Sequence, residues 1–242
     1  DRVCFFNFTA SHDGIGLRPV KGILSDEEIN YLVSHVEDHG GLVSFRANEN
    51  GTESPYELNC SYIDILTHPD ESDMIRIKRM LLSQGTVLAM PGVPGIYFHS
   101  LVGSRNYHDG VKHTGINRAI NREKYNIDWL ENELSEQGSL SKTMFDSYKR
   151  LISIRINEAA FNPHGAFHFL DLDPRLFAIL QVSVEKEEHI LAVHNFSDET
   201  VTSVIPDDIG LPLNDLLTPY EVDVTRTIEL EPYQMMWLKG SL

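Results

Sequence analysis

The stretch VCFFNFTASHDGIGLRP, residues 3–19, decides how the first half of this sequence is interpreted. In residues 3–8, apolar and polar side chains alternate too little for a half-exposed strand. The segment therefore predicts a strand buried on both faces, as in a parallel sheet. His12 and Asp13 follow at the point where that strand ends. Because the carboxyl ends of the strands carry the chemistry of parallel α/β folds, this pair is a candidate site.

The His12–Asp13 pair has more than one interpretation. An imidazole and a carboxylate can hydrogen-bond a polyhydroxylated ligand and oppose developing positive charge, and Gly14 and Gly16 let the backbone turn tightly beside it. A metal phosphohydrolase would need further His and Asp ligands on helices, and the remaining histidines are scattered, so we expect no metal site. The structural alternative is that Asp13 caps a turn and His12 is an ordinary loop residue.

Outward from this stretch, strands and helices alternate. A helix is predicted after Ser25, which forms a capping box with Glu28 and ends at the Gly40–Gly41 pair. A polar loop over 44–60, a helix from 69 to 82, a buried strand at 95–100, an aperiodic loop over 103–125 and a helix over 141–157 follow. This order fits a parallel α/β unit, but two strands cannot close a sheet or a barrel. Residues 1–157 are therefore predicted to be the last part of a larger α/β domain.

The pattern changes after about residue 158. Short apolar strands separated by turns follow one another, among them FAILQVSV (177–184), HILAVHNF (189–196) and YQMMWL (233–238). Strands spaced in this way predict an antiparallel β-domain. The expected organisation is thus 1–157 for the α/β part and 158–242 for an all-β domain.

The predicted loop after the second strand is basic, although the chain as a whole is acidic. It holds Arg105, Lys112, His113, Arg118, Arg122 and Lys124. Arginine is suited to bidentate contact with phosphate or a carboxylate, so the loop could receive an anion near His12–Asp13; the alternative is a solvated surface. In the preceding loop, Tyr56 could stack on a sugar ring and Glu57 could bind hydroxyls, with a plain surface again as the alternative.

The amino-acid composition limits the classes of partner that the protein is expected to bind. The 242 residues carry 36 acidic and 20 basic side chains, a formal net charge of −16, which disfavours binding to nucleic acid. Apolar runs are far shorter than the roughly 20 residues of a membrane span. The two cysteines, Cys4 and Cys60, lie in apolar segments and predict buried free thiols in a reducing cytoplasm.

Several motifs together resemble a known family. FNFTASHDGIG (6–16) is similar to the fourth conserved region of the α-amylase superfamily, glycoside hydrolase family thirteen. MPGVPGIYFHS (90–100) resembles the superfamily's approach to its eighth barrel strand, and LAVHNFSDETV (191–201) and LEPYQMMWLK (230–239) resemble its C-terminal β-domain. The glycines after His-Asp, PYELN (55–59) and INREK (120–124) resemble the sucrose phosphorylase group, which includes sucrose, sucrose 6-phosphate and glucosylglycerate phosphorylases.

The resemblance implies a fold and roles for individual residues. It implies the last strands and helices of a (β/α)8 barrel followed by a small antiparallel β-domain. Asp13 would stabilise the transition state and His12 would bind the sugar. Tyr56 and Glu57 would form a mobile-loop pair that reshapes the acceptor site. Sucrose phosphorylases usually have Gln at the second position, so Glu57 is a departure that disfavours sucrose.

The loop arginine Arg122 would help to receive phosphate, whereas Arg118 and Lys112 match no family position and are named only as contacts for an anionic acceptor.

The activity implied is transfer of glucosyl from an α-glucoside to inorganic phosphate, with retention and without a cofactor. Such enzymes need a nucleophile and an acid/base carboxylate, about 5–5.5 Å apart. No position here matches either residue, so this chain is expected to be inactive by itself. The alternatives are an α-glucoside hydrolase of the same superfamily and a non-catalytic sugar-binding or structural fragment. The sequence leaves the acceptor and the oligomeric state open.

Overall fold

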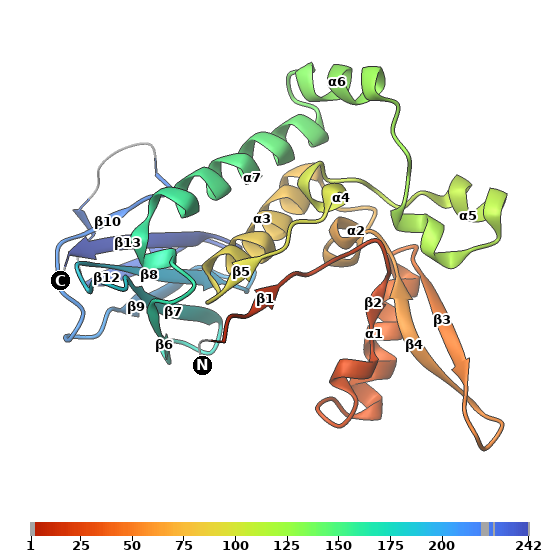
Figure 1. Ribbon diagram of the computed structural model, residues 1–242, viewed down its shortest axis with the longest axis horizontal. Coiled ribbons are helices and arrows are strands. Elements are labelled where there is room, and N and C mark those ends of the chain that lie inside the picture. Colours follow the sequence, from red (N-terminus) through yellow and green to blue (C-terminus); the bar gives the residue numbers. More distant parts are fainter. Residues whose placement is uncertain (1–2, 219–222, 225, 242) are drawn as a thin grey trace. The chain divides into compact units, whose positions relative to one another are not determined.

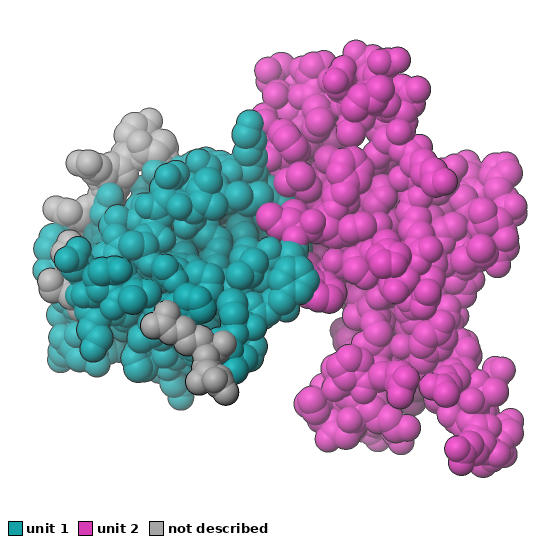
Figure 2. All heavy atoms as spheres, in the orientation of Figure 1, with its two compact units in different colours: residues 1–7, 81–95, 147–242 teal, residues 8–80, 96–146 magenta. Residues whose placement is uncertain are grey.

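The computed structural model describes residues 3–218, 223–224 and 226–241 (Figure 1). Its contacts divide the chain into two units that are not contiguous in sequence. One comprises Asp1–Asn7, Leu81–Gly95 and Ser147–Leu242, and the other Phe8–Met80 and Ile96–Asp146 (Figure 2). The division at residue 157 stays a prediction about sequence-contiguous domains.

The C-terminal β-domain belongs to the first unit and is antiparallel, as predicted. Six strands form one sheet in the order β11-β10-β13-β8-β7-β6. Their bounds are Asp223–Val224, Leu213–Asp215, Met235–Ser241, Glu188–Asn195, Leu176–Val182 and Ala166–Leu170. A separate pair joins β9, Val201–Val204, to β12, Thr227–Leu230. The exposed and buried residues of β9 alternate, which is typical of a strand with one face in the core.

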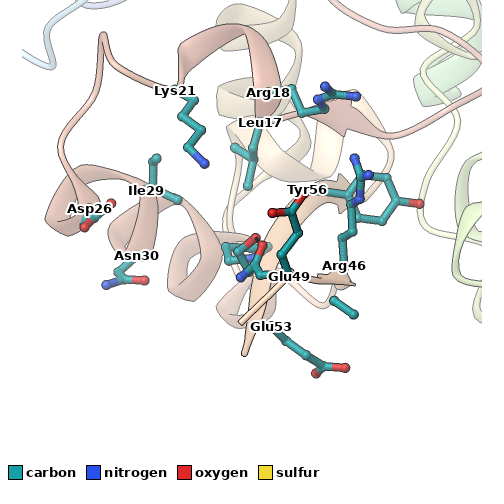
Figure 3. Close-up of a pocket in the computed structure, with 14 residues that line it drawn as sticks. Leu17, Arg18, Lys21, Asp26, Ile29, Asn30, Arg46, Glu49, Glu53 and Tyr56 are labelled. Atoms are coloured by element: carbon teal, nitrogen blue, oxygen red, sulfur yellow. Dashed lines mark hydrogen bonds between the residues drawn. The ribbon is translucent and has the colours of Figure 1, made fainter. Parts of the chain in front are cut away.

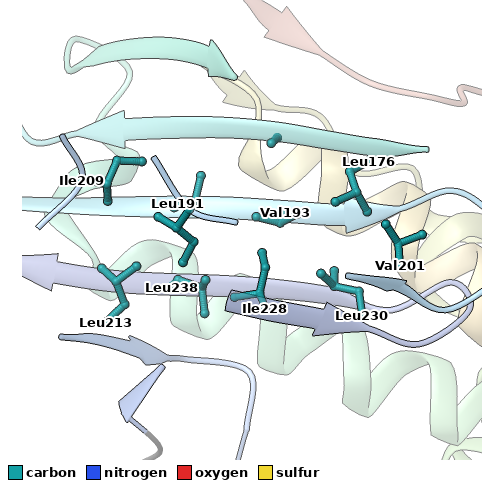
Figure 4. Close-up of a cluster of buried hydrophobic side chains, with 11 residues drawn as sticks. Leu176, Leu191, Val193, Val201, Ile209, Leu213, Ile228, Leu230 and Leu238 are labelled. Carbon is teal, nitrogen blue, oxygen red and sulfur yellow. The ribbon is translucent and has the colours of Figure 1, made fainter. Parts of the chain in front are cut away.

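An apolar cluster joins these two sheets. Leu191 and Val193 of β8 and Leu238 of β13 meet Ile228 and Leu230 of β12 there, and all five are buried (Figure 4). Burial of this kind supplies roughly 1.5–3 kcal/mol for each large aliphatic side chain. The β-domain therefore has a core of its own.

The N-terminal strand is shorter and more exposed than predicted. β1, Phe6–Asn7, pairs in parallel with β5, Val93–Pro94, so the parallel arrangement is confirmed. The prediction of a strand buried on both faces is wrong, because Phe5 and Phe6 are 57% and 66% exposed. Among the described residues only one short strand pairs with β1, which leaves its faces uncovered. Gly92 allows the pairing, since a Cβ there would lie 2.4 Å from the carbonyl oxygen of Phe5.

Two long helices are confirmed with altered bounds. α3, Asp73–Ala89, begins and ends later than the helix predicted over 69–82, and α7 spans Leu140–Asn157. The buried Tyr148 hydroxyl of α7 donates to Gln84 Oε1 of α3 at 2.8 Å. The Arg155 guanidinium donates to the carbonyl oxygens of Leu88 and Gly92, the latter at 2.7 Å. A 3-10 turn, η3 (Ala159–Phe161), follows α7.

In the second unit, α1 spans Asp26–Asp38 and the predicted capping box is present. The Glu28 amide donates to Ser25 Oγ at 3.3 Å, and the Ser25 amide donates to Glu28 Oε2 at 2.7 Å. The predicted loop over 44–60 is instead a hairpin of β3, Leu42–Ala47, and β4, Glu53–Asn59. β2, Ile15–Gly16, pairs with β4 to complete a sheet in the order β2-β4-β3. η1, Arg18–Val20, follows β2, and α2 spans Tyr62–Leu66.

The predicted strand at 95–100 and loop over 103–125 are also corrected. Short helices occupy this part of the chain: α4 (Phe98–Leu101), α5 (His108–Thr114), η2 (Asn117–Asn121) and α6 (Ile127–Ser135). The segments are too short to show a helical period in sequence, and Gly115 ends α5 in the left-handed conformation at φ 68°.

In the described part of the chain, no helix combines the length and apolarity needed to cross a membrane. Nor do three or more His, Cys, Asp or Glu side chains gather there in a group that could hold a metal ion.

Candidate functional site

Strand pairing brings the loop that follows β1 against β4. Ile15 and Gly16 of β2 pair with Leu58 and Glu57 of β4. The Gly14 amide, one residue before β2, donates to Glu57 Oε1 at 2.7 Å. A Cβ at Gly14 would lie 2.3 Å from the carbonyl oxygen of Leu58, so only glycine allows this close approach. Asp13 and Glu57 are thereby fixed near each other, although they lie far apart in sequence.

Arg118 of η2 connects these two carboxylates. Its Nε donates to Glu57 Oε2 at 2.9 Å, and its Nη1 lies 3.1 Å from Asp13 Oδ1. The Glu57 side chain is only 3% exposed, whereas that of Arg118 is 37% exposed. The hydrogen bond to Glu57, with the nearby charges of Glu57 and Asp13, raises the pKa of Arg118. Arg118 therefore remains a cation at every relevant pH.

Arg122, directly after η2, makes a second contact with Asp13. Its Nη2 lies 2.6 Å from Asp13 Oδ1, and its Nε donates to the carbonyl oxygen of His12. Asn121 was not predicted, yet its Nδ2 donates to the carbonyl oxygens of Asp13 at 3.1 Å and Ser11 at 3.3 Å. The only sequence signal for Asn121 is its position beside Arg122. Together these contacts hold the loop over residues 11–13 from both its backbone and its side chains.

Part of the His12–Asp13 pair faces solvent. The Asp13 side chain is 40% exposed, and among the described contacts its Oδ1 receives both arginines while Oδ2 receives no hydrogen bond. His12 is 72% exposed, with Nε2 3.6 Å from Asp13 Oδ1. One carboxylate oxygen and one imidazole are thus available to a polar ligand.

Tyr56 lines a separate hollow in the same unit. Neighbouring side chains of a strand point to opposite faces, so Tyr56 and Glu57 diverge from β4. The hollow has a volume of about 760 Å³, and Arg18, Lys21 and Arg46 also line it (Figure 3). Tyr56 therefore belongs to the wall of an open pocket, whereas the buried Glu57 belongs to the ionic cluster with Asp13, Arg118 and Arg122.

Two of the remaining cations of the predicted basic loop, Lys112 and Arg105, pair with carboxylates elsewhere. Lys112 of α5 lies 3.2 Å from Asp109, both side chains are exposed, and no described contact joins Lys112 to Asp13 or Glu57. Arg105 pairs with the buried Asp64, whose Oδ2 accepts from the Asn106 amide at 2.7 Å. Arg105 thus helps to fix the segment around residues 105–106 to Asp64. The structure brings together His12, Asp13, Glu57, Arg118 and Arg122 from the predicted set, and it leaves Lys112 apart.

The cluster can perform two kinds of chemistry. Two carboxylates balance two guanidinium groups, and each guanidinium retains N–H donors beyond those used in the contacts above. Such a group can bind an anion through the free N–H donors and a hydroxyl through the free carboxylate oxygen.

Comparison with known proteins gives the family. No family model matches the chain. The glucosylglycerate phosphorylase of Spirochaeta thermophila is 37% identical over 249 residues, covering 98% of this chain and 42% of that protein. The glucosylglycerate phosphorylase of Escherichia coli is also 37% identical, over 236 residues, covering 97% of this chain and 41% of that protein.

A crystal structure of sucrose 6F-phosphate phosphorylase from Thermoanaerobacter thermosaccharolyticum shares the fold. Its TM-score is 0.65 at 21% identity, covering 79% of this chain and 35% of that one. The chain belongs to the sucrose phosphorylase group, which includes the glucosylglycerate phosphorylases, and corresponds to a C-terminal part of its enzymes. It spans about two fifths of the length of the two glucosylglycerate phosphorylases.

Proposed function

We propose that the whole protein is a retaining glycoside phosphorylase that transfers glucosyl from an α-glucoside to inorganic phosphate and releases α-glucose 1-phosphate. The observation that carries the proposal is the ionic cluster in which Asp13 lies against Arg118 and Arg122. The 37% identity to two glucosylglycerate phosphorylases supports the same reaction and favours glucosylglycerate as the donor. Sucrose 6-phosphate is the second donor to test, since it too carries an anion.

The chain would form the last strands of a (β/α)8 barrel and the C-terminal β-domain. The nucleophilic Asp and the acid/base Glu would come from earlier strands, because no residue of this chain matches them. The nucleophile would attack the anomeric carbon while the acid protonates the leaving group, and phosphate would then take the glucosyl group from the enzyme. This chain by itself would not turn over substrate.

Asp13 would hold ring hydroxyls through its free Oδ2, and His12 would contact the same sugar. The two arginines fix the Asp13 carboxylate through Oδ1, so its orientation is set before the sugar binds. A preoriented carboxylate beside an oxocarbenium-like transition state stabilises that state more than the ground state. Asp13 is therefore the residue of this chain that would contribute most to the chemical step.

Arg122 would receive phosphate through the N–H donors that Asp13 and His12 leave free. Holding phosphate near the glucosyl group makes it a better acceptor than water, because it is already positioned for attack. Tyr56, which lines the separate hollow, would stack on a sugar ring there. Lys112 remains a predicted anion contact from outside the cluster. We expect the complete protein to act in the cytoplasm and to bind neither nucleic acid nor a membrane.

The test is an assay of the complete gene product with three donors: glucosylglycerate, sucrose 6-phosphate and sucrose. Each is supplied with and without phosphate, and glucose 1-phosphate and free glucose are both measured. Phosphate-dependent glucose 1-phosphate from one donor would establish the phosphorylase and identify its acceptor. Absence of glucose 1-phosphate with all three donors would refute it.

An α-glucoside hydrolase is the second candidate, and one observation favours it. Both arginines already have carboxylate partners inside the protein, so fewer of their donors are available for phosphate. In the same assay a hydrolase would release free glucose at equal rates with and without phosphate. A non-catalytic fragment would release neither product.

A further inference from the structure

The carboxylate of Glu57 is used entirely inside the protein. Oε1 accepts from the Gly14 amide at 2.7 Å and Oε2 from Arg118 Nε at 2.9 Å, and the side chain is 3% exposed. Both oxygens are therefore engaged, and Glu57 cannot also reach a ligand hydroxyl in this arrangement. Its geometry is that of a group that orients another side chain.

A glutamine could not replace Glu57 without losing one of these bonds. Its single amide oxygen could accept from the Gly14 amide, but the amide nitrogen would then face Arg118 Nε, donor against donor. Glu57 and Arg118 are thus a matched pair. The requirement for a carboxylate at position 57 exists only because Arg118 lies opposite it.

The guanidinium of Arg118 is held at two points and open elsewhere. Glu57 fixes Nε and Asp13 contacts Nη1, while the side chain keeps 37% of its surface exposed. A planar guanidinium that is fixed at Nε presents its outer N–H groups in one direction, which suits a planar carboxylate. Because Arg118 adjoins Asp13, that direction lies beside the residue proposed to hold the sugar.

We propose that Arg118 determines acceptor specificity by binding the acceptor's carboxylate, and that Glu57 is the positioning residue that aims it. This inference rests on the proposed function and deepens it, since it divides the anion-binding work between Arg118 for the acceptor and Arg122 for phosphate. The acceptor class is a small hydroxy acid such as glycerate. Neutral polyols of the same size would gain nothing from Arg118.

The experiment uses the complete gene product in the synthetic direction, with glucose 1-phosphate as donor. Glycerate, glycerol and fructose 6-phosphate serve as acceptors, and kcat and KM are measured for each. The variants are Arg118→Ala, Arg118→Lys, Glu57→Gln and the double variant Glu57→Gln/Arg118→Ala. Lys78→Ala is the matched control, because it removes one positive charge from an exposed face of α3.

For Arg118→Ala, the ratio of kcat/KM for glycerate to that for glycerol is expected to fall roughly 10- to 100-fold, as loss of a charged hydrogen-bond pair predicts. Because Arg118 also helps to orient Asp13, kcat should fall for both acceptors, and the acceptor role is read from an additional rise in KM for glycerate that glycerol does not share. Arg118→Lys keeps the charge but not the planar fork, so its ratio should be intermediate. Glu57→Gln should lower the ratio in the wild-type background and leave it unchanged when Arg118 is already Ala.

The double variant guards against a folding defect, since Arg118→Ala alone leaves a buried carboxylate unpaired. Far-UV circular dichroism and the melting temperature report folding in every variant. An equal loss for glycerate and glycerol in a folded variant would overturn the inference, as would a loss confined to fructose 6-phosphate. A wild-type enzyme that transfers glucosyl to no acceptor would refute the proposed function, and this inference with it.

Discussion

Replacing His194 with Leu should make the β-domain less sensitive to acid. His194 lies on β8, fully buried, and its ring centroid is 5.8 Å from that of Phe177 on β7. Burial lowers the pKa of His194 from 6.5 to about 3, and a contact with the backbone of Phe177 offsets only part of the effect. His194 therefore stays neutral in the folded domain at every pH from 4 upward.

The magnitude follows from linkage between protonation and unfolding. In the unfolded chain His194 gains a proton below about pH 6.5, whereas in the folded domain it does not, so stability is lost as the pH falls below that value. With the folded pKa at about 3, the loss is about 1.4 kcal/mol at pH 5.5 and about 2.7 kcal/mol at pH 4.5. At pH 7.5 the contribution is negligible, and only the packing difference between His and Leu remains.

Amide hydrogen exchange of the β8 segment, 188–195, measures the free energy of opening in the complete protein. Wild type and variant are compared at the same pH. The comparison removes the intrinsic exchange rate and the effect on stability of every other titrating group, including His189 on the same strand. The difference between the two proteins should change by about 1.4 kcal/mol between pH 7.5 and pH 5.5. A difference that stays constant over this range would refute the reasoning.

Four other predictions concern the site and the core. Gly14→Ala should abolish activity and lower the melting temperature, because its Cβ would meet a backbone oxygen at 2.3 Å; normal activity would contradict the close approach. Arg122→Ala should reduce phosphorolysis roughly tenfold more than hydrolysis of the same donor, as loss of a charged contact predicts; an equal reduction would remove Arg122 from phosphate binding. Asp13→Asn should lower kcat by roughly 100-fold or more with little change in KM, as for a group acting in the transition state; unchanged turnover would refute its role. Burial raises the pKa of Cys60 to about 12, so its thiol should react with a disulfide reagent at pH 8 only after unfolding, and fast reaction of the native protein would contradict this.

Local signals in the sequence were sufficient for some elements. The capping box at Ser25 and the apolar face behind it predicted α1, because a helix start depends on residues three apart. Short apolar segments separated by turn residues predicted the antiparallel β-domain. Cys60 is buried as predicted, whereas Cys4 is exposed on the uncovered N-terminal segment.

The β3–β4 hairpin was missed although its turn is visible in the sequence. Gly51, at φ 78°, closes the turn, and the Asn48 amide donates to the carbonyl oxygen of Thr52 at 2.8 Å. Its asparagines and glycine predicted a loop, because neither strand shows a clear period of two in apolar residues. Both strands are partly exposed, so packing does not impose that alternation.

The residues of the candidate site could be named singly from the sequence, but their arrangement could not. The sequence indicated Asp13, Glu57, Arg118 and Arg122 as candidates. It did not indicate that Glu57 points inward, because that depends on the pairing of Gly16 with Glu57 between segments about forty residues apart. Nor could charge alone separate Arg118, which joins the cluster, from Lys112, which pairs with its neighbour on α5.

The most direct test of the central claim is the formation of glucose 1-phosphate by the complete protein from glucosylglycerate, with and without inorganic phosphate. The account predicts glucose 1-phosphate that appears only when phosphate is present, together with released glycerate in equal amount. Free glucose formed at the same rate under both conditions would contradict it and would return Arg118 and Arg122 to a purely structural role.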